Sequence, residues 1–98
     1  MTASELPEVT LNEAAHRFEL HVDGHTAVEV FERFPGGIAY LHTIVPKALE
    51  GRGIAAQLVT AALTWARAQQ LQVNPVCSYV VAYIRRHPEW QDLLASAP

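Results

Sequence analysis

Two periods of hydrophobic and polar positions divide the chain near residue 50. Before this point apolar residues recur at every second position, which is the period of a β-strand with one buried face. After it they recur at every third or fourth position, as they do in a helix that packs on one side. The change of period predicts an α+β fold in which strands come first and the main helices follow.

Three strands are predicted in the first half of the chain. Residues 17–22 alternate between apolar and polar side chains, and residues 26–34 keep the period of two through Val28 and Val30. The third run, 38–45, is more apolar and is expected near the centre of the sheet. Asp-Gly and Pro-Gly-Gly turn sequences separate the three runs, so the strands should form an antiparallel meander.

The longest helix is predicted from residue 53 to about residue 70. Ile54, Leu58 and Ala62 recur at helical spacing and would share one buried face. The short apolar run 71–76, which contains Asn and Pro, predicts a brief strand. Because this strand follows a helix, we expect it to lie parallel to the strand before the helix.

A second main helix is predicted over residues 77–86. Val80, Val81 and Ile84 fall on one face of it. A further helical segment should begin at Pro88, because proline is tolerated in the first turn of a helix. The expected architecture is a mixed, mostly antiparallel sheet with two main helices.

Composition and charge narrow the function classes. The chain has 98 residues, 50% of them hydrophobic, which suits one domain over residues 1–98. Its apolar runs fall short of the roughly 20 residues that a membrane span needs, and its seven Lys and Arg residues are scattered over a chain of net charge −3. We therefore expect neither a membrane nor a nucleic-acid partner. Cys77 is the single cysteine, so a reducing, cytoplasmic location is expected.

Gly51 and Gly53 stand directly before the longest predicted helix. The first N–H groups of a helix lack partners within the helix, and together with the helix dipole they attract an anion. Glycines let such an anion approach the backbone. The alternative is that the two glycines only mark the start of the helix. The Gly-Lys-Ser/Thr of a nucleotide-binding P-loop and the third glycine of a dinucleotide fingerprint are both missing.

Three sequence blocks in order carry a resemblance to a known family: HTIVP at 42–46, GRGIAAQL at 51–58 and PVCSYVVAYIRRHPEW at 75–90. Their order resembles that of the GNAT acetyltransferase superfamily, and more closely a small branch of it marked by a Cys and a Gly motif. The resemblance implies a minimal GNAT-like fold, acetyl-CoA as co-substrate and an amine acceptor. Ala48 departs from the pattern, because the superfamily usually has Gln or Arg there.

The resemblance also implies which residues bind acetyl-CoA. The backbone of the glycine loop would hold the pyrophosphate, with Lys47 and Arg52 adding positive charge. The end of the preceding strand would bind the pantetheine arm, and a tyrosine of the second main helix would line its channel. The implied binding residues are Thr43, Ile44, Val45, Gly51, Arg52, Gly53, Ile54, Ala55 and Tyr79.

Cys77, His42 and Tyr83 are the candidate catalytic residues. Cys77 would lie near the acetyl group at a helix N-terminus, which favours a thiolate, and it either accepts the acetyl group or only lines the site. His42 is a candidate base because imidazole titrates near neutral pH, and the alternative is a histidine bonded within the sheet. Tyr83 matches the superfamily tyrosine that protonates the departing thiolate, although His87 and Pro88 replace the usual Gly-Phe.

Three hypotheses of function follow. The first is an N-acetyltransferase that acts on an amine of a small molecule, peptide or protein. The second is a non-catalytic CoA-binding or interaction module, which is favoured because elements that normally wall the acceptor site are missing, so that the site is open or completed by a partner. The third is a structural domain. A homodimer is left open. No metal is expected, because His16, His21 and His25 lack supporting ligands at metal-binding spacing.

Overall fold

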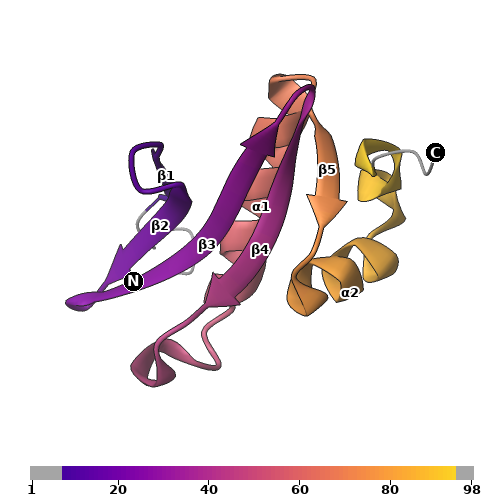
Figure 1. Cartoon of the computed structure of the whole chain (residues 1–98). Helices are drawn as coiled ribbons and strands as arrows, with labels where there is room; N and C mark the ends of the chain where they lie inside the picture. The colour runs from indigo at the N-terminus through magenta and orange to yellow at the C-terminus, as the bar shows by residue number, and fades with distance from the viewer. Residues whose placement is uncertain (1–7, 95–98) are drawn as a thin grey trace.

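The computed structural model describes residues 8–94 and arranges five strands in one sheet. The strands follow one another across the sheet in chain order (Figure 1). The first three neighbouring pairs are antiparallel, and the last pair is parallel. The strands are β1 (Thr10–Asn12), β2 (Arg17–Val22), β3 (His25–Phe34), β4 (Gly37–Ile44) and β5 (Gln72–Pro75).

Within residues 8–94, two α-helices and two short 3-10 helices complete the fold. Helix α1 lies behind β3 and β4, and α2 lies beside β5 together with the last 3-10 helix (Figure 1). No helix within residues 8–94 is long and apolar enough to cross a membrane. The helices are η2 (Lys47–Leu49), α1 (Ile54–Ala68), α2 (Ser78–Arg86) and η3 (Pro88–Leu93).

The predicted fold class is confirmed. The structure has the predicted α+β architecture, with the antiparallel meander, the parallel final strand and the two main helices. The elements begin and end within about two residues of the predicted positions. The short strand β1 was not predicted, because three residues are too few to display a period. The segment after Pro88 forms a 3-10 helix rather than an α-helix.

The prediction for the buried face of β3 is wrong. Val28 and Val30 were expected to form it, but the residues that face the helices are the odd-numbered ones, including Glu29 and Phe31. The register explains the difference, because Phe18 of β2 pairs with Glu29 and carries its own side chain into the core. A carboxyl group therefore occupies a core position.

One hydrophobic core lies between the sheet and the helices. It joins residues of β2, β3, β4 and β5 to both α-helices. Tyr40 is fully buried there, and its hydroxyl group donates a 2.6 Å hydrogen bond to the carbonyl oxygen of Ala62 in α1. This bond ties β4 to α1.

A bulge interrupts β4 directly after Tyr40. Phe31 pairs with Tyr40, and the preceding residue Val30 pairs with His42, so Leu41 is the extra residue on β4. The bulge changes the twist and direction of β4 over its last four residues.

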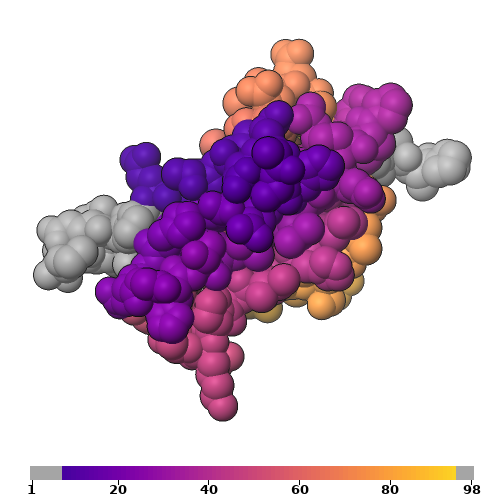
Figure 2. Space-filling model, turned by 60° about the vertical axis from the view of Figure 1, so that its left-hand side comes forward, coloured from indigo at the N-terminus to yellow at the C-terminus, as the bar shows by residue number. Residues whose placement is uncertain are grey.

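The pairing of β4 with β5 ends at the same place. Tyr40 pairs with Pro75, and the Tyr40 carbonyl oxygen then accepts hydrogen bonds from the N–H groups of Val76 and Cys77, at 3.0 and 2.9 Å. After that point the chain enters α2, and β4 continues with β3 alone. Figure 1 shows the two strands diverging, and Figure 2 shows that the segment after β4, in pink, projects from the body of the molecule.

The bond between β4 and α1 makes a stability prediction. Tyr40→Phe should lower the free energy of unfolding by about 1 kcal/mol, because a buried hydrogen bond is lost without a change of shape. Tyr83→Phe is the matched control, since the Tyr83 hydroxyl bonds Thr60 on the exposed side of α1, and its loss should cost less than about 0.5 kcal/mol. Urea unfolding measures both, and equal losses would contradict the prediction.

Candidate functional site

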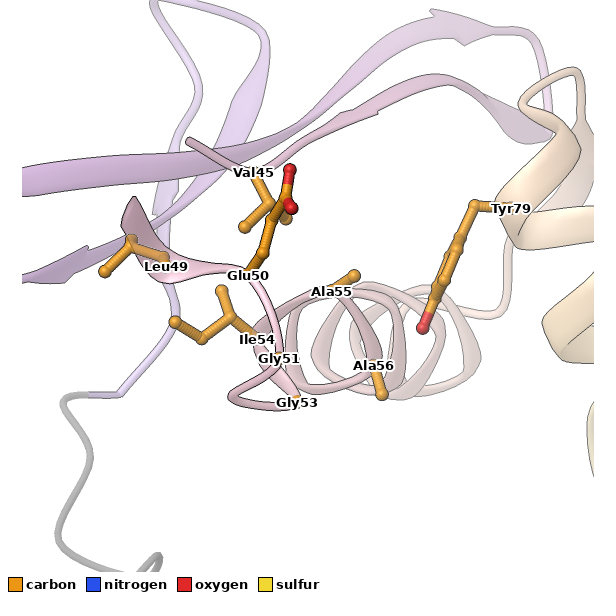
Figure 3. A pocket seen from close by; sticks show the side chains of 9 residues that line it. All are labelled: Val45, Leu49, Glu50, Gly51, Gly53, Ile54, Ala55, Ala56 and Tyr79. Atoms are coloured by element: carbon orange, nitrogen blue, oxygen red, sulfur yellow. The ribbon is translucent and has the colours of Figure 1, made fainter. Parts of the chain in front are cut away.

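A cleft of about 250 Å³ lies where the chain enters α1; we call it the loop cleft. Figure 3 shows Tyr79 of α2 on one side of it, opposite the first turn of α1, and the glycine loop on the other. The lining residues are Val45, Leu49, Glu50, Gly51, Gly53, Ile54, Ala55, Ala56 and Tyr79.

Both glycines of the loop have left-handed backbone conformations. The φ angles are +79° at Gly51 and +74° at Gly53, and Gly53 is the N-cap residue of α1. Residues with a Cβ adopt this conformation only at a cost in free energy. The local backbone conformation therefore favours glycine at both positions. No side chain caps α1, and no acidic residue lies in its first turn. The first N–H groups of α1 are therefore available to an anion.

A second cleft, of about 690 Å³, lies where β4 and β5 diverge; we call it the strand cleft. It brings the end of β4 together with the start of α2, which are separated by more than thirty residues in the sequence. Its lining residues are Leu41, His42, Thr43, Ile44, Val76, Cys77 and Ser78.

A chain of hydrogen bonds runs from the strand cleft into the core. The Cys77 sulfur, at the N-cap position of α2, lies 3.3 Å from the Thr43 hydroxyl oxygen. The Thr43 hydroxyl group in turn donates to Oε1 of Glu29, its partner across β3 and β4. The other carboxyl oxygen, Oε2, is buried and has no hydrogen-bond partner among the described residues.

The protein interior disfavours a charge on Glu29. The side chain is fully buried and forms no ion pair within residues 8–94. Burial raises the pKa of Glu29 to about 8, while the hydrogen bond from Thr43 acts in the opposite direction. A buried carboxyl group without a counter-charge is more stable in its neutral form. Sequence reasoning missed Glu29 because its strand was assigned the wrong buried face.

His42 lines the strand cleft but points away from this chain of hydrogen bonds. It is exposed, and it follows the bulge on the face of β4 opposite to the side chain of Thr43. Thr43 and Cys77 therefore reach the strand cleft from one side, and His42 reaches it from the other.

The two tyrosines of α2 lie in different surroundings. Tyr79 lines the loop cleft with 38% of its surface exposed, and the burial of the remainder raises the pKa of its phenol. Tyr83 lines neither cleft. Its hydroxyl group bonds Thr60 of α1, and its ring packs on His87 with centroids 4.3 Å apart.

Few cations approach the loop cleft. The Arg52 guanidinium group binds Asp23 in the turn between β2 and β3, at 2.9 Å. Lys47 is exposed and is not part of the lining, whereas Glu50 is. The N–H groups of the backbone are therefore the main anion-binding feature of this cleft.

The described residues contain no group of three His, Cys, Asp or Glu side chains that could hold a metal ion. His21, which was considered as a ligand, contacts Thr26 and Glu19 instead. His16 stacks on Phe31, with ring centroids 5.9 Å apart.

The fold is that of a GCN5-like protein. The solution structure of a GCN5-like protein from Staphylococcus aureus matches with a TM-score of 0.71 over 96% of this chain and 93% of that chain, at 23% sequence identity. A family model described as GCN5-related N-acetyl-transferase matches residues 17–93. The chain therefore belongs to the GCN5-related N-acetyltransferase family, which confirms the resemblance inferred from its sequence blocks.

Curated relatives match a shorter part of the chain. Protein NATD1 of Homo sapiens is 40% identical over 47 residues, which are 48% of this chain and 42% of that protein. The NATD1 proteins of Gallus gallus and Mus musculus have the same identity over 43% of their length. The match thus spans less than half of these relatives.

Burial of Glu29 makes stability depend on pH. With a pKa of about 8 in the folded chain and an ordinary value of 4.5, Glu29 holds its proton in the folded chain and loses it on unfolding between those pH values. The free energy of unfolding should therefore fall as pH rises from 5 to 8. Glu29→Gln should flatten this dependence, whereas Glu32→Gln, an exposed position on the same strand, should not. Urea unfolding at several pH values measures the slope of the free energy of unfolding against pH. Equal slopes in the wild type and both variants would contradict the prediction.

Proposed function

We propose that the protein is an acetyl-CoA-dependent N-acetyltransferase, with its co-substrate in the two clefts and an amine as its acceptor. Membership of the family supports this function. The observation that carries it is the divergence of β4 from β5, which leaves a strand edge between the glycine loop and Cys77.

The pyrophosphate is assigned to the loop cleft. Gly51 and Gly53 keep side chains away from the backbone, and the uncapped first turn of α1 supplies N–H donors. Arg52 is held by Asp23 at the surface, so its contribution requires that this pair open. Glu50 opposes an anion in the cleft, which places the phosphates nearest to the helix start.

The pantetheine arm is assigned to the edge of β4. Residues 42–44 pair with β3 only, so the opposite edge of the strand has backbone groups for an extended, amide-containing chain. Apolar side chains flank this edge, since Ile44 is 52% exposed and Val76 is 57% exposed. Such exposed apolar groups suit the methylene groups of the arm.

The thioester is assigned to the strand cleft beside Cys77. The thiol is positioned to accept an acetyl group from the thioester or to line the path of a direct attack by the amine. His42 reaches the cleft from the exposed face and is the proposed base for the incoming ammonium group. The open side of the cleft suits an acceptor on a peptide or protein.

A matched pair of glycine variants tests the co-substrate site. Gly53 and Gly36 have φ angles of +74° and +79°, and a Cβ at either would meet nothing within 4 Å. Gly53→Glu and Gly36→Glu thus add the same charge and similar backbone strain, but only the first does so at the start of α1. Calorimetry should show CoA binding at least about tenfold weaker in Gly53→Glu and unchanged in Gly36→Glu. Equal affinities would remove the pyrophosphate assignment.

Turnover against a panel of amines and peptides separates an enzyme from a binding module. Release of CoA together with an acetylated product supports the proposed function. Binding of acetyl-CoA without any product would instead support the alternative of a non-catalytic CoA-binding module.

The two tyrosines of α2 provide a test of the proton donor for the departing thiolate. We assign this role to Tyr79, because it lines the loop cleft and directly follows Cys77 and Ser78 of the strand cleft, whereas the Tyr83 hydroxyl is bound to Thr60. With an acceptor from the panel, Tyr79→Phe should lower kcat by about tenfold or more, and Tyr83→Phe should leave it within about twofold. Steady-state kinetics measures both. A loss confined to Tyr83→Phe would return the role to that residue.

A further inference from the structure

The fully buried Glu29 carboxyl group lies at the inner end of a path that begins at the only thiol of the chain. The Thr43 hydroxyl group donates to Glu29 Oε1, so its own oxygen is left to accept from the Cys77 thiol at 3.3 Å. The order of donors and acceptors is therefore thiol to hydroxyl to carboxylate. A carboxyl group needed only for structure would be expected to have both oxygens bonded, but Oε2 has no partner among the described residues.

We propose that the Glu29 carboxyl group takes the proton of the Cys77 thiol through the Thr43 hydroxyl group, and that Glu29 and Thr43 are positioning residues for acyl transfer by way of Cys77. This inference rests on the proposed acetyltransferase function. It adds to that function the route by which the thiol becomes a nucleophile.

With an acetyl thioester, the acyl-transfer step exchanges the thioester of CoA for a thioester of Cys77. The Cys77 sulfur forms a bond to the carbonyl carbon, and the bond from that carbon to the CoA sulfur breaks. Glu29 enters this step in its ionised form, which is the minor form below its pKa of about 8. The thiol proton passes to the Thr43 oxygen while the Thr43 hydroxyl proton passes to Glu29 Oε1. The CoA thiolate leaves and takes a proton from the Tyr79 phenol, the donor proposed above, which regains one from solvent.

The return step restores the starting state. The amine nitrogen attacks the acetyl carbon, the bond from carbon to the Cys77 sulfur breaks, and the surplus amine proton goes to solvent by way of His42, the proposed base. The Cys77 thiolate then regains its proton from Glu29 through Thr43. No oxidant, metal or further reactant is required.

The surroundings of Glu29 suit proton exchange with a thiol. Its pKa of about 8 lies within about one unit of the value of an ordinary thiol, so the transfer needs little free energy. The other titratable group facing it is the phenol of Tyr40 on β4, and burial and the Glu29 charge both raise the pKa of that phenol. From β2 the facing residue is the apolar Phe18.

Alkylation of Cys77 by iodoacetamide tests the path without any need for CoA. Cys77 is the only cysteine, so mass spectrometry reports the reaction at one site. Thr43→Val keeps the shape but removes the hydroxyl group, and it should slow alkylation at pH 7.5 by about tenfold or more. Thr43→Ser restores a hydroxyl group and should recover the wild-type rate to within about threefold.

The pH profile separates proton transfer from altered access to the thiol. Near pH 10, where an ordinary thiol is ionised without help, Thr43→Val should react within about threefold of wild type. A tenfold deficit that persists unchanged at pH 10, or a wild-type rate at pH 7.5, would overturn the proposal. Glu29→Gln should give the same profile as Thr43→Val, and combining the two changes should add no further loss. If Glu29→Gln does not fold, the alkylation rates of Thr43→Val and Thr43→Ser alone test the proposal.

The same variants distinguish failure of this inference from failure of the proposed function. Iodoacetamide rates that depend on Thr43, in a protein that does not bind acetyl-CoA, would support the proton path and refute the co-substrate. Acetyl-CoA binding together with Thr43-independent alkylation would refute the path and leave the proposed function in place.

Discussion

The hydrogen bonds of Tyr40 determine where the sheet opens, and both clefts depend on that point. Its carbonyl oxygen accepts from the N–H groups of Val76 and Cys77, and its hydroxyl group holds Ala62 of α1. Beyond Tyr40, β4 bulges and loses β5 as a neighbour. Tyr40 thus fixes three features relative to one another through its side chain and its backbone: the strand edge, the start of α2 and the position of α1.

The anion site of the proposed function relies little on cationic side chains. Arg52 is bound to Asp23, Lys47 is exposed, and Glu50 lines the loop cleft. The N–H groups at the start of α1 carry the attraction, because they are oriented by the helix itself. For the same reason the presence of Ala48, where Gln or Arg is usual, does not remove the site.

Much of the fold could be predicted from the sequence, because the change of period marks sheet and helices and because glycine is needed at a helix start with positive φ. The core position of Glu29 could not be predicted from the period, since β3 has apolar residues on both faces. The sequence feature that could have predicted it is the two-residue turn between β2 and β3. This turn pairs Val22 with His25 and thereby determines which face of β3 is buried. The meeting of Thr43 and Cys77 is a tertiary contact between distant segments, which no local pattern encodes.

In the proposed function, a CoA thioester lies along the diverging edge of β4 with its pyrophosphate at the start of α1. A titration of the ¹⁵N-labelled protein with acetyl-CoA, followed by two-dimensional NMR, tests it most directly. The account predicts saturable shifts of the amides of residues 41–44, residues 51–56 and Cys77, with those of β1 and β2 unchanged. An absence of shifts at millimolar acetyl-CoA, or shifts confined to β1 and β2, would contradict it.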